Sequence, residues 1–195
     1  MTMQPMVRVL AVGLSLLAVA CGGGTPQAQE EAAPAADPAQ APGGASVLGD
    51  LIQDWERQKD ALMGIAAAMP EEMFGYKSTP AQRSYGEQIM HIATVNVGLL
   101  KLVGGASLPP SFTADSVATK AEMLQALAES YDHGIALLNE QTDASMHETI
   151  DAAFLGPSTR ARLFWFLLGH SMDTYGQMAV YLRLNDIVPP ASRGV

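Results

Sequence analysis

Apolar residues recur at helical spacing through most of the chain that follows residue 46. This spacing places them on one face of an α-helix, whereas a half-buried strand would alternate apolar and polar residues. Alternation of that kind is weak throughout, and no internal repeat is visible. The pattern therefore predicts an all-α protein. In the first helix the apolar face is expected at Leu48, Leu51, Trp55, Leu62, Ile65 and Met69.

Capping signals mark where the helices begin. Pro70 ends the first helix, and a long connection with a second proline leads to the next one. Ser84 with Glu87, and Thr119 with Glu122, match the capping box, in which a Ser or Thr is followed three residues later by Glu or Gln. These two boxes predict the starts of the second and third helices.

The remaining boundaries complete a set of four helices. The second helix is expected to stop at GGASLPP (104–110), and the fourth to run from about Ser158 to Asn185. The polar connection before the fourth helix fits a short strand or an extra helical turn. Four helices that each bury one stripe predict a four-helix bundle. The second and third helices are expected to bury Ile92, Val95, Leu99 and Leu102, and Leu124, Ala128, Tyr131, Ile135 and Leu138.

The N-terminus has the layout of an export signal. Arg8 precedes an apolar run from Val9 to Ala20, which is shorter than the ~20 residues of a comfortable membrane span. The segment LAVAC, ending at Cys21, resembles a bacterial lipobox. That resemblance implies cleavage before Cys21 and lipidation of its thiol and new amino group. The alternative is a plain signal peptide that a chance cysteine follows.

Residues 22–46 are rich in Gly, Ala, Pro and Gln and contain no aromatic or large aliphatic residue. Such a segment buries too little apolar surface to offset the entropy of ordering it, which predicts a disordered tether. The protein is thus expected to be exported and held at the cell envelope by a lipid. The expected division is 1–20 signal peptide, 21–46 tether and 47–195 helical bundle.

Charge and cysteine content exclude other classes. The formal net charge of −9 argues against a nucleic-acid partner, because phosphate binding requires a basic patch. Cys21 is the single cysteine, so the chain cannot form an internal disulfide framework.

The fourth helix carries the pattern most typical of a site. Its expected inner stripe is apolar at both ends and polar in the middle, which is the layout of a small internal site. A lone core histidine is more often a hydrogen-bonded structural residue than a ligand. A second histidine, His91, lies on another helix at the edge of its stripe, which favours a site. The expected stripe is Leu163, Leu167, His170, Thr174, Gln177, Tyr181 and Leu184.

Two segments resemble the signature regions of the DinB/YfiT-like superfamily. They are MPEEMFGYKSTPAQRSYGEQIMHIATVN (69–96) and GHSMDTYGQMAVYLRLNDIVPPASR (169–193). The resemblance implies a four-helix bundle that holds a divalent metal, often zinc or nickel, on three histidines. Carried over by position, His91 is the ligand from the second helix and His170 the first of a pair on the fourth. The third ligand position falls on Thr174.

Thr174 departs from that pattern, because a protonated hydroxyl is a poor zinc ligand. The site is therefore expected to be degenerate, meaning that it lacks one of its three ligands. Asp173 and Gln177 are expected at the border of the cavity, with Tyr181 also lining it. The expected cofactor is a weakly bound zinc or nickel ion, or no metal.

The resemblance leaves two functions open. The preferred one is a non-catalytic envelope module whose cavity binds a small ligand, or whose helix face binds a partner such as a second protomer. The alternative is a metal-dependent enzyme, such as the DinB-like transferases of small thiols. Against it stand the missing histidine and the export signal, since such thiols serve mainly in the reducing cytoplasm. His133 and His147 are expected on the surface.

Overall fold

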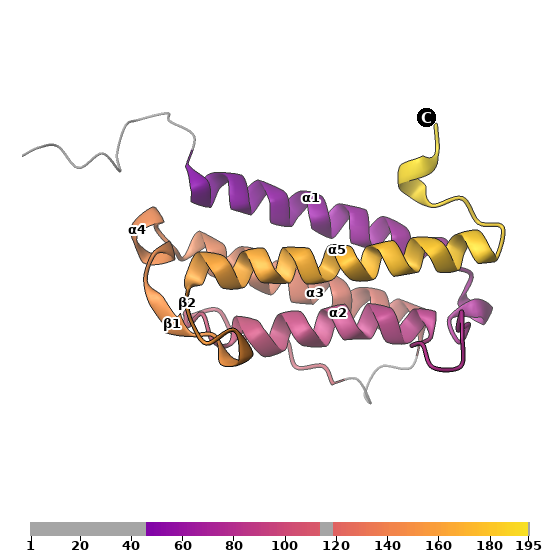
Figure 1. Ribbon diagram of the computed structural model, residues 1–195, viewed down its shortest axis with the longest axis horizontal. Coiled ribbons are helices and arrows are strands. Elements are labelled where there is room, and N and C mark those ends of the chain that lie inside the picture. The colour runs from indigo at the N-terminus through magenta and orange to yellow at the C-terminus, as the bar shows by residue number, and fades with distance from the viewer. Residues whose placement is uncertain (1–45, 114–118, 195) are drawn as a thin grey trace, which may run out of the picture. The chain divides into compact units, whose positions relative to one another are not determined.

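The computed structural model describes residues 46–113 and 119–194 of the chain. Most of these residues belong to four long helices that lie side by side (Figure 1). The prediction of a four-helix bundle is confirmed. The four helices are α1 (Val47–Ala68), α2 (Tyr85–Leu100), α3 (Lys120–Asn139) and α5 (Arg160–Leu184).

Each long helix begins with a Ser or Thr whose side-chain oxygen accepts a backbone N–H of the first turn. Such caps satisfy donors that the helix itself leaves unpaired. Both predicted capping boxes form, because the carboxylates of Glu87 and Glu122 accept the backbone N–H of the capping residue in return. The four caps are Ser46, Ser84, Thr119 and Thr159.

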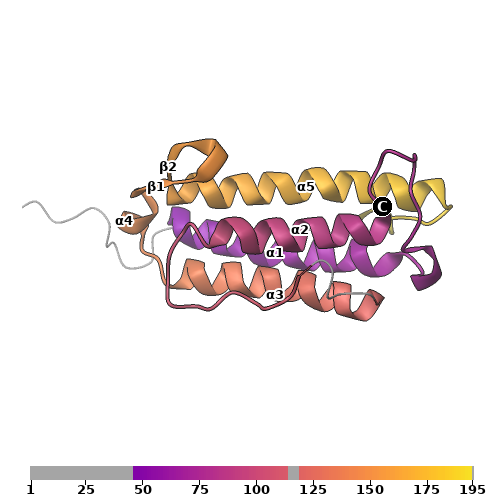
Figure 2. The same ribbon diagram turned by 90° about the horizontal axis from the view of Figure 1, so that it is seen from below.

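Each of the four long helices packs against two others. α1 contacts α3 and α5, and α2 contacts the same two helices. Figure 2 shows α5 and α3 on opposite sides of α1 and α2. The ammonium group of Lys120 donates to the carbonyl oxygens of Ala67 and Met69, so α3 begins beside the end of α1. The Tyr85 hydroxyl donates to the carbonyl of Ile65 in the last turn of α1, so α2 also begins beside the end of α1. α2 and α3 therefore run parallel to each other.

Short elements fill the other end of the bundle (Figure 1). Strands β1 (Thr149–Asp151) and β2 (Pro157–Thr159) pair antiparallel just after the one-turn helix α4 (Asp143–Met146). The connection before the fourth helix thus contains both a helical turn and strands, the two alternatives that the pattern left open. Three 3-10 turns complete the elements among the described residues: η2 (Glu71–Met73), η4 (Ala153–Leu155) and η5 (Pro190–Ser192).

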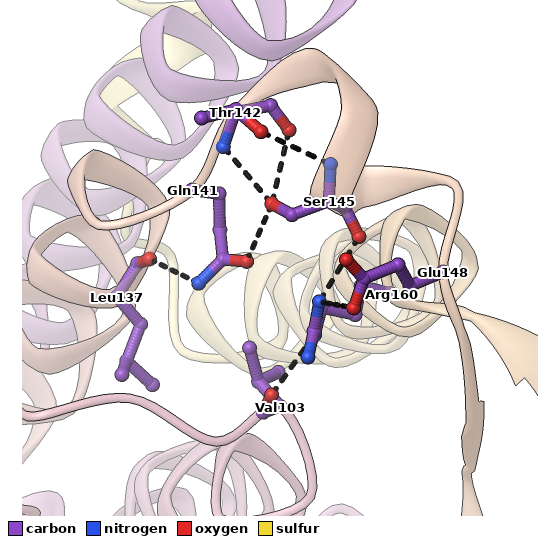
Figure 3. A network of polar contacts seen from close by, with 7 residues as sticks. All are labelled: Val103, Leu137, Gln141, Thr142, Ser145, Glu148 and Arg160. Atoms are coloured by element: carbon purple, nitrogen blue, oxygen red, sulfur yellow. Dashed lines mark hydrogen bonds and ion pairs between the residues drawn. The ribbon is translucent and has the colours of Figure 1, made fainter.

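Arg160 ties the start of α5 to this end of the bundle (Figure 3). Its guanidinium donates to the carbonyl oxygens of Val103 and Ser145 and to the carboxylate of Glu148, at 3.1, 3.2 and 2.6 Å. Gln141 bridges α3 to the same group, because its amide oxygen accepts from the Ser145 hydroxyl at 2.9 Å. The network fixes the first turn of α5 against the end of α2 and against α4, so α5 runs antiparallel to α2.

The largest buried side chains meet between α1, α3 and α5. The rings of Trp55 and Tyr131 have centroids 5.2 Å apart, and those of Trp55 and Phe164 are 5.5 Å apart. Gly134 makes room for the indole, because a Cβ atom there would lie 2.3 Å from Cζ3 of Trp55. The predicted face of α1 is confirmed, with Leu48 at its edge only partly buried.

The predicted face of α3 is partly wrong. Tyr131 and Leu138 are buried, but Leu124, Ala128 and Ile135 are only partly buried. α3 is instead turned so that a glycine faces Trp55, and apolar spacing does not register a glycine as part of a face. Four further positions also differ from the prediction: Val95, Leu99 and Leu102 are only partly buried, and Leu184 is exposed. The residues that replace the expected ones in the core are Leu100, Leu127 and Leu137.

The predicted signal peptide and Cys21 lie outside the described residues, as does the tether apart from Ser46. Within residues 46–113 and 119–194, no helix combines the length and the apolar character needed to cross a membrane.

Candidate functional site

His91 and His170 meet between α2 and α5. Their Nε2 atoms are 3.0 Å apart, and their ring centroids are 4.8 Å apart. Because α2 and α5 are antiparallel neighbours, these residues from distant parts of the chain occupy the same level of the bundle. The sequence-based expectation named both residues, and the structure brings them together.

Both imidazoles are partly buried, and burial lowers the pKa of each. The positive charge of Arg83 lowers the pKa of both rings further, while the carboxylate of Asp173 opposes the shift at His170. Two neutral rings can share one hydrogen bond, in which one Nε2–H donates and the other Nε2 accepts. The Nδ1 atom of His170 is buried and has no hydrogen-bond partner among the described residues.

Thr174 is buried one turn further along α5, with only 1% of its surface exposed. Its hydroxyl donates to the carbonyl of His170 at 3.2 Å, a bond within its own helix. In the part of the chain that the structure describes, no group of three or more His, Cys, Asp or Glu side chains could hold a metal ion. Two imidazoles and a hydroxyl engaged by the backbone do not fit a three-histidine metal site.

Two glutamines extend the polar region beyond Thr174, toward the end of α5 and the start of α2. The amide of Gln88 donates to Gln177 at 2.9 Å, and the amide of Gln177 donates to Asp173 at 3.0 Å. Asp173 is exposed and its carboxylate engages Gln177. Gln88 is fully buried on α2, and the sequence-based expectation missed it, because a glutamine beside Glu87 looks like part of an exposed polar face.

Tyr181 is buried, but it serves a different part of the molecule. Its hydroxyl donates to the carbonyl of Arg83 at 2.8 Å, and its ring contacts the rings of Tyr76 and Tyr85. These contacts anchor the connection that precedes α2. Tyr181 therefore holds the wall of a neighbouring cleft, and that wall carries Arg83.

This cleft has a volume of about 680 Å³ and lies along the first turns of α2. One of its walls is the connection before α2, and Met123 reaches it from α3. The spacing of residues along the chain gave no sign of the cleft, because a loop and two helices form it together. His91 is the member of the histidine pair that lines it. The other lining residues are Lys77, Pro80, Ala81, Gln82, Arg83, Ser84, Gly86, Glu87, Met90 and Thr94.

The prediction that His133 is a surface residue is wrong, since only 7% of it is exposed. The carboxylate of Glu140 accepts the backbone N–H groups of Ala106 and Ser107 and so holds the loop after α2 over α3. His133 lies beneath this loop, and burial lowers its pKa. His147 is exposed, as expected.

Comparisons with known proteins agree with this architecture. The sequence model of the DinB superfamily matches residues 54–178. No curated protein sequence matches the chain at a significant level. Among solved structures, a DinB-like protein from Bacillus cereus has a TM-score of 0.63 at 18% identity, over 72% of this chain and 93% of that one. A DinB-like protein of Bacillus subtilis, YjoA, has a TM-score of 0.57 at 17% identity, over 70% and 92% of the two chains.

Proposed function

Because the chain belongs to the DinB superfamily, we propose that it uses the superfamily's helical scaffold as a non-catalytic binding module of the cell envelope. One observation carries this proposal. The imidazoles of His91 and His170 face each other at 3.0 Å, while the side chain at the third position, Thr174, bonds to its own helix. The two histidines are thus paired with each other, and an accessible cleft lies next to them.

Two imidazoles alone should hold a divalent ion weakly. Structural and catalytic zinc sites in proteins have at least three protein ligands. Wild-type protein should therefore show only weak binding of zinc or nickel, or none. The cleft beside His91 is within the range of volumes that small-molecule sites have, roughly 300–1,000 Å³. A small ligand in this cleft, or a partner chain such as a second protomer, is what the module would bind.

A metal-dependent DinB-like enzyme, for example a thiol transferase, is the second candidate, and the same pair of histidines favours it. Two nitrogens bonded to one zinc ion at about 2.0–2.1 Å in a tetrahedron lie about 3.3 Å apart. The Nε2 atoms, at 3.0 Å, are close to that separation. A ligand from outside the described residues, or from a substrate, would then complete the site.

Calorimetric titration with zinc separates the two candidates. The proteins to compare are wild type, Thr174→His and His170→Ala, each first checked for its helical circular-dichroism spectrum. Thr174→His should gain affinity for zinc by orders of magnitude, because a third imidazole adds a strong bond in a preformed bundle. His170→Ala should lose whatever binding wild type has. If wild type binds one zinc tightly and Thr174→His adds nothing, the binding-module proposal is wrong and the enzyme is favoured.

Attachment to the membrane belongs to the same proposal and rests on the lipobox-like segment ending at Cys21. Wild-type protein should partition with membranes, and Cys21→Ser should release it or leave it unprocessed. Mass spectrometry of the exported protein is the decisive measurement. A soluble product that lacks residues 1–20 and carries no lipid mass would contradict the anchor.

A further inference from the structure

We infer that the cleft beside His91 binds a small monocarboxylate with an apolar body, and that Arg83 recognises its carboxylate. This inference rests on the proposed binding function and names the class of ligand. Three features of the cleft support it: an unpaired cation, a ring nitrogen available as a donor and an apolar wall.

The unpaired cation is Arg83. Lys77 is the other cation that lines the cleft, and its ammonium group lies 3.2 Å from the carboxylate of Glu87. Glu87 in turn caps α2, and these contacts lower its pKa. The guanidinium of Arg83 has no hydrogen bond or ion pair with any residue of 46–113 or 119–194. Its backbone is nevertheless held, because Tyr181 donates to its carbonyl at 2.8 Å. The cleft thus presents one positive charge that none of the described residues neutralises.

The available donor is Nδ1 of His91. In the histidine pair, one Nε2–H must donate to the other Nε2. If His91 donated, His170 would carry its proton on Nδ1, which is buried without a partner among the described residues. A buried N–H without an acceptor is rarer in proteins than an acceptor without a donor. The favoured arrangement therefore has His170 donating from Nε2, which leaves His91 with an N–H at Nδ1. His91 is also the ring of the pair that lines the cleft.

A carboxylate fits these groups better than other ligands do. A guanidinium can bind both oxygens of a carboxylate through two parallel hydrogen bonds, and an imidazole N–H can supply a third. Glu87 lines the same cleft, so its negative charge disfavours a dianion such as phosphate. Met90 and Met123 offer flexible apolar surface for the body of the ligand. Met123 packs against Gly86, where a Cβ atom would lie 2.9 Å from its sulfur.

The test compares carboxylates with uncharged analogues of the same shape. Hexanoate, benzoate and phenylacetate are titrated into the full-length chain beside hexanamide, benzamide and phenylacetamide, and inorganic phosphate serves as a simple anion. Binding is followed by calorimetry and by shifts of the Gly86 and Met123 amide signals in NMR spectra. At least one carboxylate should bind while its amide binds at least about tenfold more weakly, since hydrogen bonds between charged groups are strong.

Two variants locate the charge that matters. Arg83→Gln should weaken carboxylate binding by at least about tenfold. The matched control is Lys77→Gln with Glu87→Gln, which removes the existing ion pair without changing the net charge. Glutamine is compatible with the capping box, so α2 keeps its cap. This double variant should weaken carboxylate binding far less than Arg83→Gln does.

Other results would overturn the inference. Amides that bind as well as acids, phosphate that binds as well as carboxylates, or wild type that binds no member of the panel would each do so. Equal weakening by Arg83→Gln and by the control would assign recognition to the general charge of the cleft. The zinc titration decides the proposed binding function separately, because it reports on His170 and Thr174 and does not depend on the carboxylates.

Discussion

Two layers of this bundle solve the packing problem in opposite ways. In the aromatic layer, Trp55, Tyr131 and Phe164 are almost fully buried, and their rings meet edge to face or tilted. In the polar layer, His91 and His170 face each other between α2 and α5, and both remain partly exposed. One layer is filled by large apolar side chains. The other consists of polar groups whose hydrogen-bonding capacity is only partly used.

The two layers are expected to contribute differently to the stability of the fold. Truncating a buried aromatic residue costs ~3–5 kcal/mol, because apolar surface and packing are lost together. A neutral hydrogen bond contributes only about 0.5–1.5 kcal/mol net, and burying its partners offsets part of that. The polar layer therefore adds little to the stability of the fold. The polar layer lies beside the open cleft, so we expect it to contribute to ligand binding, whereas the aromatic layer contributes to stability.

The largest effect is expected in the aromatic layer. Trp55→Ala should lower the free energy of unfolding by ~3–5 kcal/mol in urea denaturation, because the indole is buried against two other rings. The chain provides its own control in Trp165, which is 46% exposed. Trp165→Ala should change the same quantity by less than about 1 kcal/mol. Equal losses for the two variants would mean that the aromatic layer does not dominate stability.

A smaller effect is expected when the histidine pair is broken. His91→Leu or His170→Leu alone should cost about 1–3 kcal/mol, since each leaves the other ring without its partner. The double variant should cost less than the sum of the two, because it leaves no partly buried nitrogen unpaired. Urea denaturation at pH 7.5 gives the coupling energy. Strict additivity would show that the rings do not interact in solution.

The same pair predicts how stability depends on pH. Burial lowers the pKa of His91, His133 and His170 below the ordinary histidine value of 6.5. Unfolded histidines then take up protons at a higher pH than folded ones do. The unfolded state is favoured as pH falls through 6.5, and the full stability contribution is present above that value.

Melting temperatures measured from pH 7.5 to 5.5 test this dependence. The wild-type melting temperature should fall across the range. The double leucine variant should show a shallower decline, because it retains only His133 among the three perturbed histidines. An unchanged slope in that variant would assign the acid sensitivity to other groups.

Much of the fold follows from local signals in the sequence. Ser84 and Thr119 cap the helices that their capping boxes predict, and the apolar spacing of α1 defines its buried face. These features depend on residues within a few positions of one another. The face of α3 does not, because it depends on Gly134 meeting an indole from α1. Likewise His133 is buried only because the loop after α2 folds over it.

The candidate site also has features that nearby residues predict and features that depend on distant segments. His91 and His170 were predicted from a polar patch on a helix and from the family resemblance, and the structure brings them together. Tyr181 belongs to the predicted inner stripe, yet its hydroxyl anchors the connection before α2. Spacing along a helix predicts which way a side chain points. It does not predict which loop will approach that side chain, and here the loop completes the cleft.

The smallest expected effect concerns Thr174, and it sharpens the contrast between the layers. Thr174 is buried like the aromatic residues, but among the described residues its hydroxyl bonds only to the His170 carbonyl within α5. Such back-bonding adds little to a helix, whose backbone carbonyl keeps its own partner. Thr174→Val conserves the shape and should change the free energy of unfolding by less than about 1 kcal/mol. Chemical denaturation at pH 7.5 measures it. A loss of more than about 2 kcal/mol would mean that the hydroxyl holds the polar layer together, and that this layer, too, stabilises the fold.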